Sequence, residues 1–209
     1  MKNQNTPKPV SVQAGPGREP WWGQRARRCQ SGFTLGELLL VLVIIGVLAV
    51  VAFRSVQPII ISGRVEATAT DTNNAVQRII SAANSGVSGT AIDYSTVTTT
   101  VFSTMLTASN MFRVNAGAIT HRLSTGTTPT VTVDGTVLTN AGLALTFNQV
   151  HDAACIDLTS LLQTAAVLVT VNGTTVKNST IAAAVAFNGA TAAVNCTAGS
   201  TNTLVFTFQ

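Results

Sequence analysis

The hydropathy pattern is dominated by one long apolar segment, which begins at Phe33 and ends at Phe53, with Glu37 as its only charged residue. A helix of this length spans roughly 30 Å at about 1.5 Å per residue, which matches the hydrocarbon core of a bilayer. Three arginines within residues 25–28 precede the segment, and positive charge flanks membrane helices on the cytoplasmic side. The pattern therefore predicts a membrane-spanning helix with a cytoplasmic N-terminus and an exported C-terminal domain.

Helical spacing of apolar residues continues beyond this segment, over residues 56–63 and again over residues 76–83. Residues 67–74, which lie between them, are polar and only weakly patterned. We therefore predict one helix over residues 33–84, of which residues 33–53 form the membrane-spanning part. Such a helix is roughly 75 Å long, more than the remaining residues can cover. Its apolar half needs to be buried in lipid or against other copies of the chain.

Two local signals shape the predicted helix. Pro58 lacks a backbone N–H, so we expect the helix to bend near Arg54. The sequence Asn84-Ser85-Gly86 provides a stop, because glycine at that position suits a left-handed C-terminal cap.

The pattern in residues 85–209 is that of an α+β domain. We expect a short helix capped by Ser95, with its apolar residues between Val97 and Leu106 on one side, and a second helix over residues 152–163 with Asp152 as N-cap. Alternation and turn pairs predict strands at residues 130–137 (with a hairpin turn at Asp134-Gly135), 143–147, 167–171, 174–177 (after Asn172-Gly173), 181–187 (before Asn188-Gly189) and 204–208. The predicted fold class is α+β, in which a long N-terminal hydrophobic helix packs against an antiparallel sheet.

Composition and charge narrow the possible functions. Charged residues make up 10% of the chain, against roughly 25% in soluble domains, which excludes a charge-rich disordered protein. The net charge is +4, but six of the twelve basic residues lie in the first 28 positions. From Phe33 onward there are six basic and seven acidic residues. The basic character therefore belongs to the N-terminus, and no nucleic-acid partner is expected.

A carboxylate in an apolar helix is costly and marks a functional position. The motif Gly32-Phe33-Thr34-Leu35-Gly36-Glu37-Leu38, together with the apolar segment and the upstream arginines, resembles the class III signal of type IV prepilins. An uncleaved signal anchor is the alternative interpretation, but it leaves Glu37 unexplained. An ordinary secretory signal would need a small-residue cleavage site, which residues 50–54 provide poorly.

The resemblance covers about residues 28–60 and implies a pilin fold and a processing pathway. It implies that residues 1–32 form a basic leader, which a prepilin peptidase removes by cutting between Gly32 and Phe33, and that Phe33 becomes N-methylated. Glu37 would be the fifth residue of the mature chain and would act in assembly. The length of the leader resembles the type IVb group.

The same resemblance implies how the chain functions. It would be the structural subunit of a type IV pilus, located in the inner membrane before assembly and in an extracellular filament afterwards. Its partners would be other copies of itself, the prepilin peptidase and the inner-membrane assembly machinery. The filament would serve adhesion, aggregation or cell–cell contact.

The implied loss of the leader removes Cys29 and leaves Cys155 and Cys196 in the exported domain, where oxidation is expected. A disulfide between them would stabilise the fold by roughly 4 kcal/mol through the loop that it closes. In pilins such a C-terminal disulfide delimits an exposed, variable region, here the loop of residues 155–196. A pair of free, buried cysteines is the alternative.

The sequence contains no recognisable catalytic constellation. His151, Asp152 and Cys155 suggest a zinc site only weakly, because no further cluster completes four ligands and His121 stands alone. Nucleophile-elbow, phosphate-loop and paired-carboxylate motifs are missing from the sequence. We therefore expect no enzyme activity, no metal and no cofactor.

Two alternative functions fit the same features. A minor pilin or a secretion pseudopilin would share the signal and the helix but would prime or cap a filament. A signal-anchored periplasmic binding protein would retain its N-terminal segment and would never polymerise. A DNA-uptake role is disfavoured, because only Arg113, Arg122 and Lys177 carry positive charge in residues 94–209.

Overall fold

The computed structural model describes residues 33–85, 92–180 and 184–209. Within these ranges the helices are α1 (Leu35–Ser62), α2 (Val65–Asn84), α3 (Thr99–Met105), α4 (Asp152–Leu162) and α5 (Gly189–Asn195). The strands are β1 (Phe112–Asn115), β2 (Ala118–His121), β3 (Thr130–Asp134), β4 (Leu143–His151), β5 (Leu168–Val171), β6 (Thr174–Asn178) and β7 (Ser200–Phe208). The chain divides into two compact units, residues 1–44 and 45–209, and the described part of the first is the beginning of α1.

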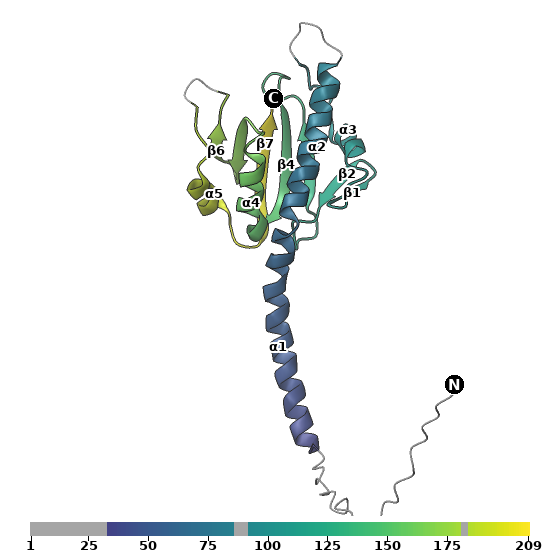
Figure 1. Ribbon diagram of the computed structural model, residues 1–209, viewed down its shortest axis with the longest axis vertical. Helices are drawn as coiled ribbons and strands as arrows, with labels where there is room; N and C mark the ends of the chain where they lie inside the picture. The colour runs from purple at the N-terminus through teal and green to yellow at the C-terminus, as the bar shows by residue number, and fades with distance from the viewer. Residues whose placement is uncertain (1–32, 86–91, 181–183) are drawn as a thin grey trace, which may run out of the picture. The chain divides into compact units, whose positions relative to one another are not determined.

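The strands of the second unit form one antiparallel sheet in the order β1-β2-β3-β4-β7-β5-β6. The C-terminal strand β7 therefore lies between β4 and β5 in the middle of the sheet. Figure 1 shows α2 and α4 side by side across one face of this sheet. The long N-terminal helical segment and the antiparallel sheet confirm the predicted α+β class.

The core lies between this face of the sheet and α2 and α4. Phe147 on β4 is at its centre, with its ring centroid 6.3 Å from that of Phe112 and 6.0 Å from that of Phe206. All three rings are buried, as are the leucines of β4, β7 and α4 at Leu143, Leu145, Leu158, Leu162 and Leu204. The sheet and its helices therefore share one continuous core.

The predicted single helix over residues 33–84 is two helices, separated at Gly63 and Arg64. The backbone N–H of Arg64 donates to the carbonyl of Ile61 at 3.0 Å, a tighter turn than the α-helix, before α2 begins. α1 continues through both Arg54 and Pro58, so Pro58 does not end the helix. The predicted end at Asn84 is confirmed, with Ser85 as the C-cap, while Gly86 lies outside the described residues.

Residues 67–74 are better packed than their weak pattern indicates. Thr68, Ala69 and Thr72 are buried on α2. The hydroxyl of Thr68 donates to the carbonyl of Arg64 at 2.8 Å, and that of Thr72 donates to the carbonyl of Thr68 at 2.7 Å. Since each buried hydroxyl is satisfied by its own helix, threonine here behaves as a small core residue.

Several predictions for the domain are wrong in detail. Thr98, not Ser95, caps α3, and its hydroxyl accepts a hydrogen bond from the N–H of Val101. Asp134-Gly135 does not form a two-residue hairpin, because the connection from β3 to β4 runs over residues 135–142. Gly135 is instead required by a close approach, since a Cβ there would lie 1.8 Å from the carbonyl oxygen of Tyr94.

The predicted strand at residues 181–187 is also wrong over its described part, residues 184–187, where only an isolated bridge joins Val185 to Asn178. Asn188 is the N-cap of α5 and not a hairpin turn residue. By contrast, the turn at Asn172-Gly173 is confirmed. Both of its residues have positive φ, of 49° and 82°, and it joins β5 to β6.

Candidate functional site

The first candidate site is α1, whose side chains are exposed along most of its length. Each described side chain from Leu35 to Phe53 is exposed, with 82% of Leu35 and 75% of Phe53 accessible. Among the described helices, the continuous helical region that begins with α1 has the length and hydropathy to cross a membrane. Soluble monomers rarely expose an apolar surface of this size. The helix is therefore built to be covered by lipid or by protein.

The start of α1 follows from the sequence around Glu37. The hydroxyl of Thr34 accepts a hydrogen bond from the backbone N–H of Glu37 at 3.2 Å. Thr34 and Glu37 have the spacing of a capping box, and a carboxylate in the first turn complements the helix dipole. Glu37 is exposed in an otherwise apolar surface. Its carboxylate therefore supports the helix end and is also available to another molecule.

Of the two residues at the predicted cleavage point, Phe33 lies just before α1 with 74% of its side chain exposed. Gly32 lies outside the described residues. The structure therefore positions the residue that would become the new N-terminus, four residues before Glu37.

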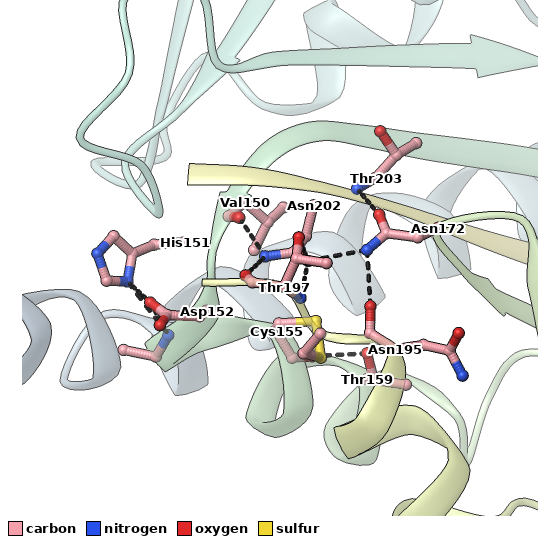
Figure 2. The surroundings of a disulfide bond; sticks show 12 residues. Val150, His151, Asp152, Cys155, Thr159, Asn172, Asn195, Thr197, Asn202 and Thr203 are labelled. Atoms are coloured by element: carbon pink, nitrogen blue, oxygen red, sulfur yellow. Dashed lines mark hydrogen bonds and ion pairs between the residues drawn. A yellow bond between two sulfur atoms is a disulfide. The ribbon is translucent and has the colours of Figure 1, made fainter. Parts of the chain in front are cut away.

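The second candidate site is the loop of residues 155–196. A disulfide joins Cys155, buried within α4, to Cys196 at the C-cap of α5, and their Cα atoms are 6.0 Å apart. The loop contains β5, β6 and α5, so the disulfide ties the outer end of the sheet to the helix that covers its centre. Figure 2 shows the sulfur atoms beside a network of asparagine and threonine side chains.

Asn202 on β7 is the centre of that network and is completely buried. Its amide nitrogen donates to the carbonyl of Val150 at 3.0 Å and to that of Thr197 at 2.8 Å. Its amide oxygen accepts from the N–H of Thr197 at 2.7 Å and from the side chain of Asn172 at 2.9 Å. One side chain thus connects β4, the residues after the disulfide and the β5–β6 turn (Figure 2).

The residues considered for zinc do not form a metal site. His151 and Asp152 contact each other at the start of α4, where both accept from the N–H of Ala153. His151, not Asp152, is the N-cap of the helix. The sulfur of Cys155 is used by the disulfide. Over the described ranges, no group of three or more His, Cys, Asp or Glu residues could hold a metal.

Sequence reasoning missed Asn202 although a signal was present. Residue 202 alternates with Leu204, Phe206 and Phe208, which are all buried on β7. A period-2 pattern extended by one step would have placed an amide in the core, where it needs several partners. His121 was noted only as an isolated residue. It is buried at the end of β2, and its Nε2 donates to the carbonyl of Asn148 at 2.8 Å.

Comparison with known proteins identifies the family. Residues 27–53 match the family model described as the prokaryotic N-terminal methylation motif, and residues 64–209 match the model described as PilS N terminal. The chain belongs to this PilS family. Among solved structures, the chain is similar to the type IV b pilin from Salmonella typhi, with 19% identity and a TM-score of 0.45. That similarity covers 69% of this chain and 96% of the other. No curated protein sequence matches the chain.

The two family matches of this PilS-family chain fall on either side of the end of α1. The methylation motif covers Phe33, Glu37 and the apolar segment as far as Phe53, and the PilS match begins at Arg64, where α1 has ended. The chain is therefore type IV pilin-like, and its family is one of structural pilins and not of enzymes.

Proposed function

We propose that this chain is the structural subunit of a type IV pilus, made as a membrane-inserted prepilin and polymerised through α1. The observation that carries the proposal is the exposure of the apolar side chains of α1 from Leu35 to Phe53 within a chain that has a methylation motif. Before assembly, lipid covers this helix. After assembly, the same surface is covered by α1 of other copies.

The proposal includes a processing step at the start of α1. A prepilin peptidase cuts between Gly32 and Phe33 on the cytoplasmic side and removes residues 1–32, after which Phe33 is N-methylated. Exposure of Phe33 ahead of the first turn of α1 supports access to this position.

Glu37 acts in assembly by pairing with a terminal amine. Cutting after Gly32 creates a positive amine on Phe33, and both charges are costly where they enter an apolar filament core. Within one chain the Glu37 side chain lies about one helical turn away from the amine of Phe33. A neighbouring subunit that is displaced along the axis brings its amine to Glu37, which neutralises both charges and sets the position at which subunits add.

The loop of residues 155–196 and the rest of the domain form the outer part of the filament. Contacts of the fibre with surfaces or other cells, in adhesion, aggregation or cell–cell contact, belong to this part. The β5–β6 turn and α5 lie within it, and 85% of the Val194 side chain on α5 is exposed.

N-terminal sequencing and intact mass of material sheared from the cell surface test this function. We expect an abundant chain that begins with N-methylated Phe33, in filaments visible by electron microscopy. Gly32→Val should block cleavage, because a branched side chain crowds the peptidase site. Gly46→Val is the matched control, since Gly46 has nothing within 4 Å and lies far from the cut, and it should be processed normally.

The same experiment separates the alternatives. A processed chain that is present only in traces among other fibre subunits would indicate a minor pilin or pseudopilin. An unprocessed chain that stays in the membrane fraction would indicate a signal-anchored periplasmic protein and would refute the proposal.

A further inference from the structure

A hollow of about 400 Å³ lies between the start of α2 and the β1–β2 hairpin. Arg64 reaches it from the N-cap of α2, Arg113 from β1, and Arg122 from the residue after β2. Thr120, Ser124 and Thr127 add hydroxyl groups to its wall. We call this hollow the arginine pocket.

The backbone brings the three arginines together from distant positions in the sequence. Arg113 is paired with Thr120 in the β1–β2 register, so their side chains lie on the same side of the hairpin. Nη1 of Arg64 donates to the backbone carbonyl of Arg122 at 3.4 Å, which holds the start of α2 against the end of β2.

Among the described residues, none neutralises the positive charge of the arginine pocket. No acidic residue lines it, and none of the three guanidinium groups forms an ion pair with any residue that the structure describes. These arginines are half of the six basic residues that follow Phe33. Placing them around one hollow without a carboxylate costs electrostatic repulsion that a bound anion would relieve.

One nitrogen of Arg122, which lines the pocket, is also unpaired among the described residues. Nε of Arg122 is buried and has no hydrogen-bond partner among the described residues. An unsatisfied buried donor costs roughly 1–3 kcal/mol, more when it is charged. His121, which also lines the pocket, does not supply an acceptor, because its Nε2 donates to the carbonyl of Asn148 and its Nδ1 accepts from the N–H of Leu123.

We propose that the arginine pocket binds a phosphate-type oxyanion, either a free phosphate or the phosphate of a lipid headgroup. Guanidinium groups bind tetrahedral oxyanions through paired N–H donors, and three of them favour a doubly charged group over a single carboxylate. The hydroxyls of Ser124 and Thr127 supply further donors to the same anion. This binding is independent of whether the chain assembles into a pilus.

A calorimetric titration tests the proposal. Inorganic phosphate is added to the full chain in neutral detergent micelles, and the heat of binding is measured. We expect saturable binding of phosphate and of sulfate, and none of chloride at equal ionic strength. Arg113→Gln and Arg122→Gln should each weaken phosphate binding about tenfold or more, because each removes charge-assisted hydrogen bonds. Arg113 is exposed, so its variant keeps the test valid if Arg122→Gln fails to fold.

Arg78→Gln is the matched control, since it removes the same charge from α2 outside the arginine pocket, and it should leave phosphate binding unchanged. Equal weakening by Arg78→Gln, or no phosphate binding beyond that of chloride, would overturn the proposal. Micelles that contain phosphatidic acid distinguish the sources of the anion. If phosphatidic acid in the micelles weakens the binding of inorganic phosphate, the pocket binds a lipid headgroup. If the affinity for inorganic phosphate is the same with and without phosphatidic acid, the pocket binds soluble phosphate.

Discussion

His121 shows how the environment of one residue couples the fold to pH. Burial lowers the pKa of the imidazole to about 4, and the hydrogen bond to the carbonyl of Asn148 opposes this only in part. Its ring centroid lies 5.8 Å from that of Phe147 in the core. The folded chain therefore holds His121 neutral, whereas the unfolded chain takes up a proton below the ordinary pKa of 6.5.

The sign of the pH effect follows from these two pKa values. Between pH 6.5 and about 4 the unfolded state binds more protons, so the free energy of unfolding falls as the pH falls. At 1.36 kcal/mol per pH unit, His121 lowers the free energy of unfolding by up to about 3 kcal/mol over this range. Thermal unfolding in micelles at pH 7 and pH 4.5 should show it. His121→Gln should reduce this dependence and His151→Gln should leave it intact; an unchanged dependence in His121→Gln would contradict the argument.

Asn202 allows a second prediction at the scale of one residue. Asn202→Leu has nearly the same shape but leaves the N–H of Thr197 and the carbonyl of Val150 without their partner, whereas Asn172 keeps its hydrogen bond to the carbonyl of Asn195. Because buried unpaired groups cost about 1–3 kcal/mol each, we expect a loss of at least about 2 kcal/mol in stability. Thr201→Val, on the exposed side of the same strand, should change the melting temperature little. Equal melting temperatures for both variants would argue against the network.

At the scale of elements, the predictions from the sequence agree with the structure where one strong local signal determines the helix or turn. The apolar periodicity of residues 152–163 and the Asn172-Gly173 turn predicted α4 and the β5–β6 hairpin. The β1–β2 hairpin was missed because its turn places Ala116 at a positive φ of 48° before Gly117, and this turn lacks an Asn-Gly or Asp-Gly pair. The break at Gly63 was missed because apolar spacing continues across it.

The candidate sites also differ in whether a local signal in the sequence predicts them. Gly32, Phe33 and Glu37 form a local motif that the sequence alone reveals. Only Cys155 and Cys196 remain once the leader is lost, so the number of cysteines predicts their pairing. The arginine pocket could not be predicted, because Arg64, Arg113 and Arg122 meet only through the packing of α2 against the first hairpin.

The disulfide gives a prediction for the loop of residues 155–196. Cys196→Ala should lower the free energy of unfolding by roughly 4 kcal/mol, because it frees this loop in the unfolded chain. It leaves the buried Cys155 side chain in the core, so little of the loss comes from a cavity. Cys155→Ala adds such a cavity and should be the less stable of the two. Alkylation of both thiols in unreduced, exported protein would show that the disulfide does not form there.

At the scale of the whole molecule, the chain separates its functions along the sequence. Half of the basic residues precede Phe33, the exposed apolar surface lies on α1, and the described polar networks lie in the domain. Under the proposed function, residues 1–32 would set orientation in the membrane, α1 would drive self-association, and the domain would form the exterior of the filament. A test of the proposed function must therefore change association without changing insertion or folding.

Glu37 offers that test, because its carboxylate lies in the apolar helix and outside the domain. Leucine at this position is fully acceptable to a bilayer, so Glu37→Leu should insert in the membrane and still be cut after Gly32. As the only subunit present, however, it should form few or no fibres, since no carboxylate neutralises the amine of Phe33 on the neighbouring subunit.

Glu37→Gln separates charge from helix capping. Glutamine can take the same place in a capping box with Thr34, and the hydrogen bond from the N–H of residue 37 to the hydroxyl of Thr34 uses only the backbone. If the charge sets the position of added subunits, Glu37→Gln should fail to assemble as Glu37→Leu does. Electron microscopy of sheared fractions, with intact mass to verify processing, measures the result. Wild-type numbers of fibres from Glu37→Gln would limit Glu37 to stabilising the start of α1.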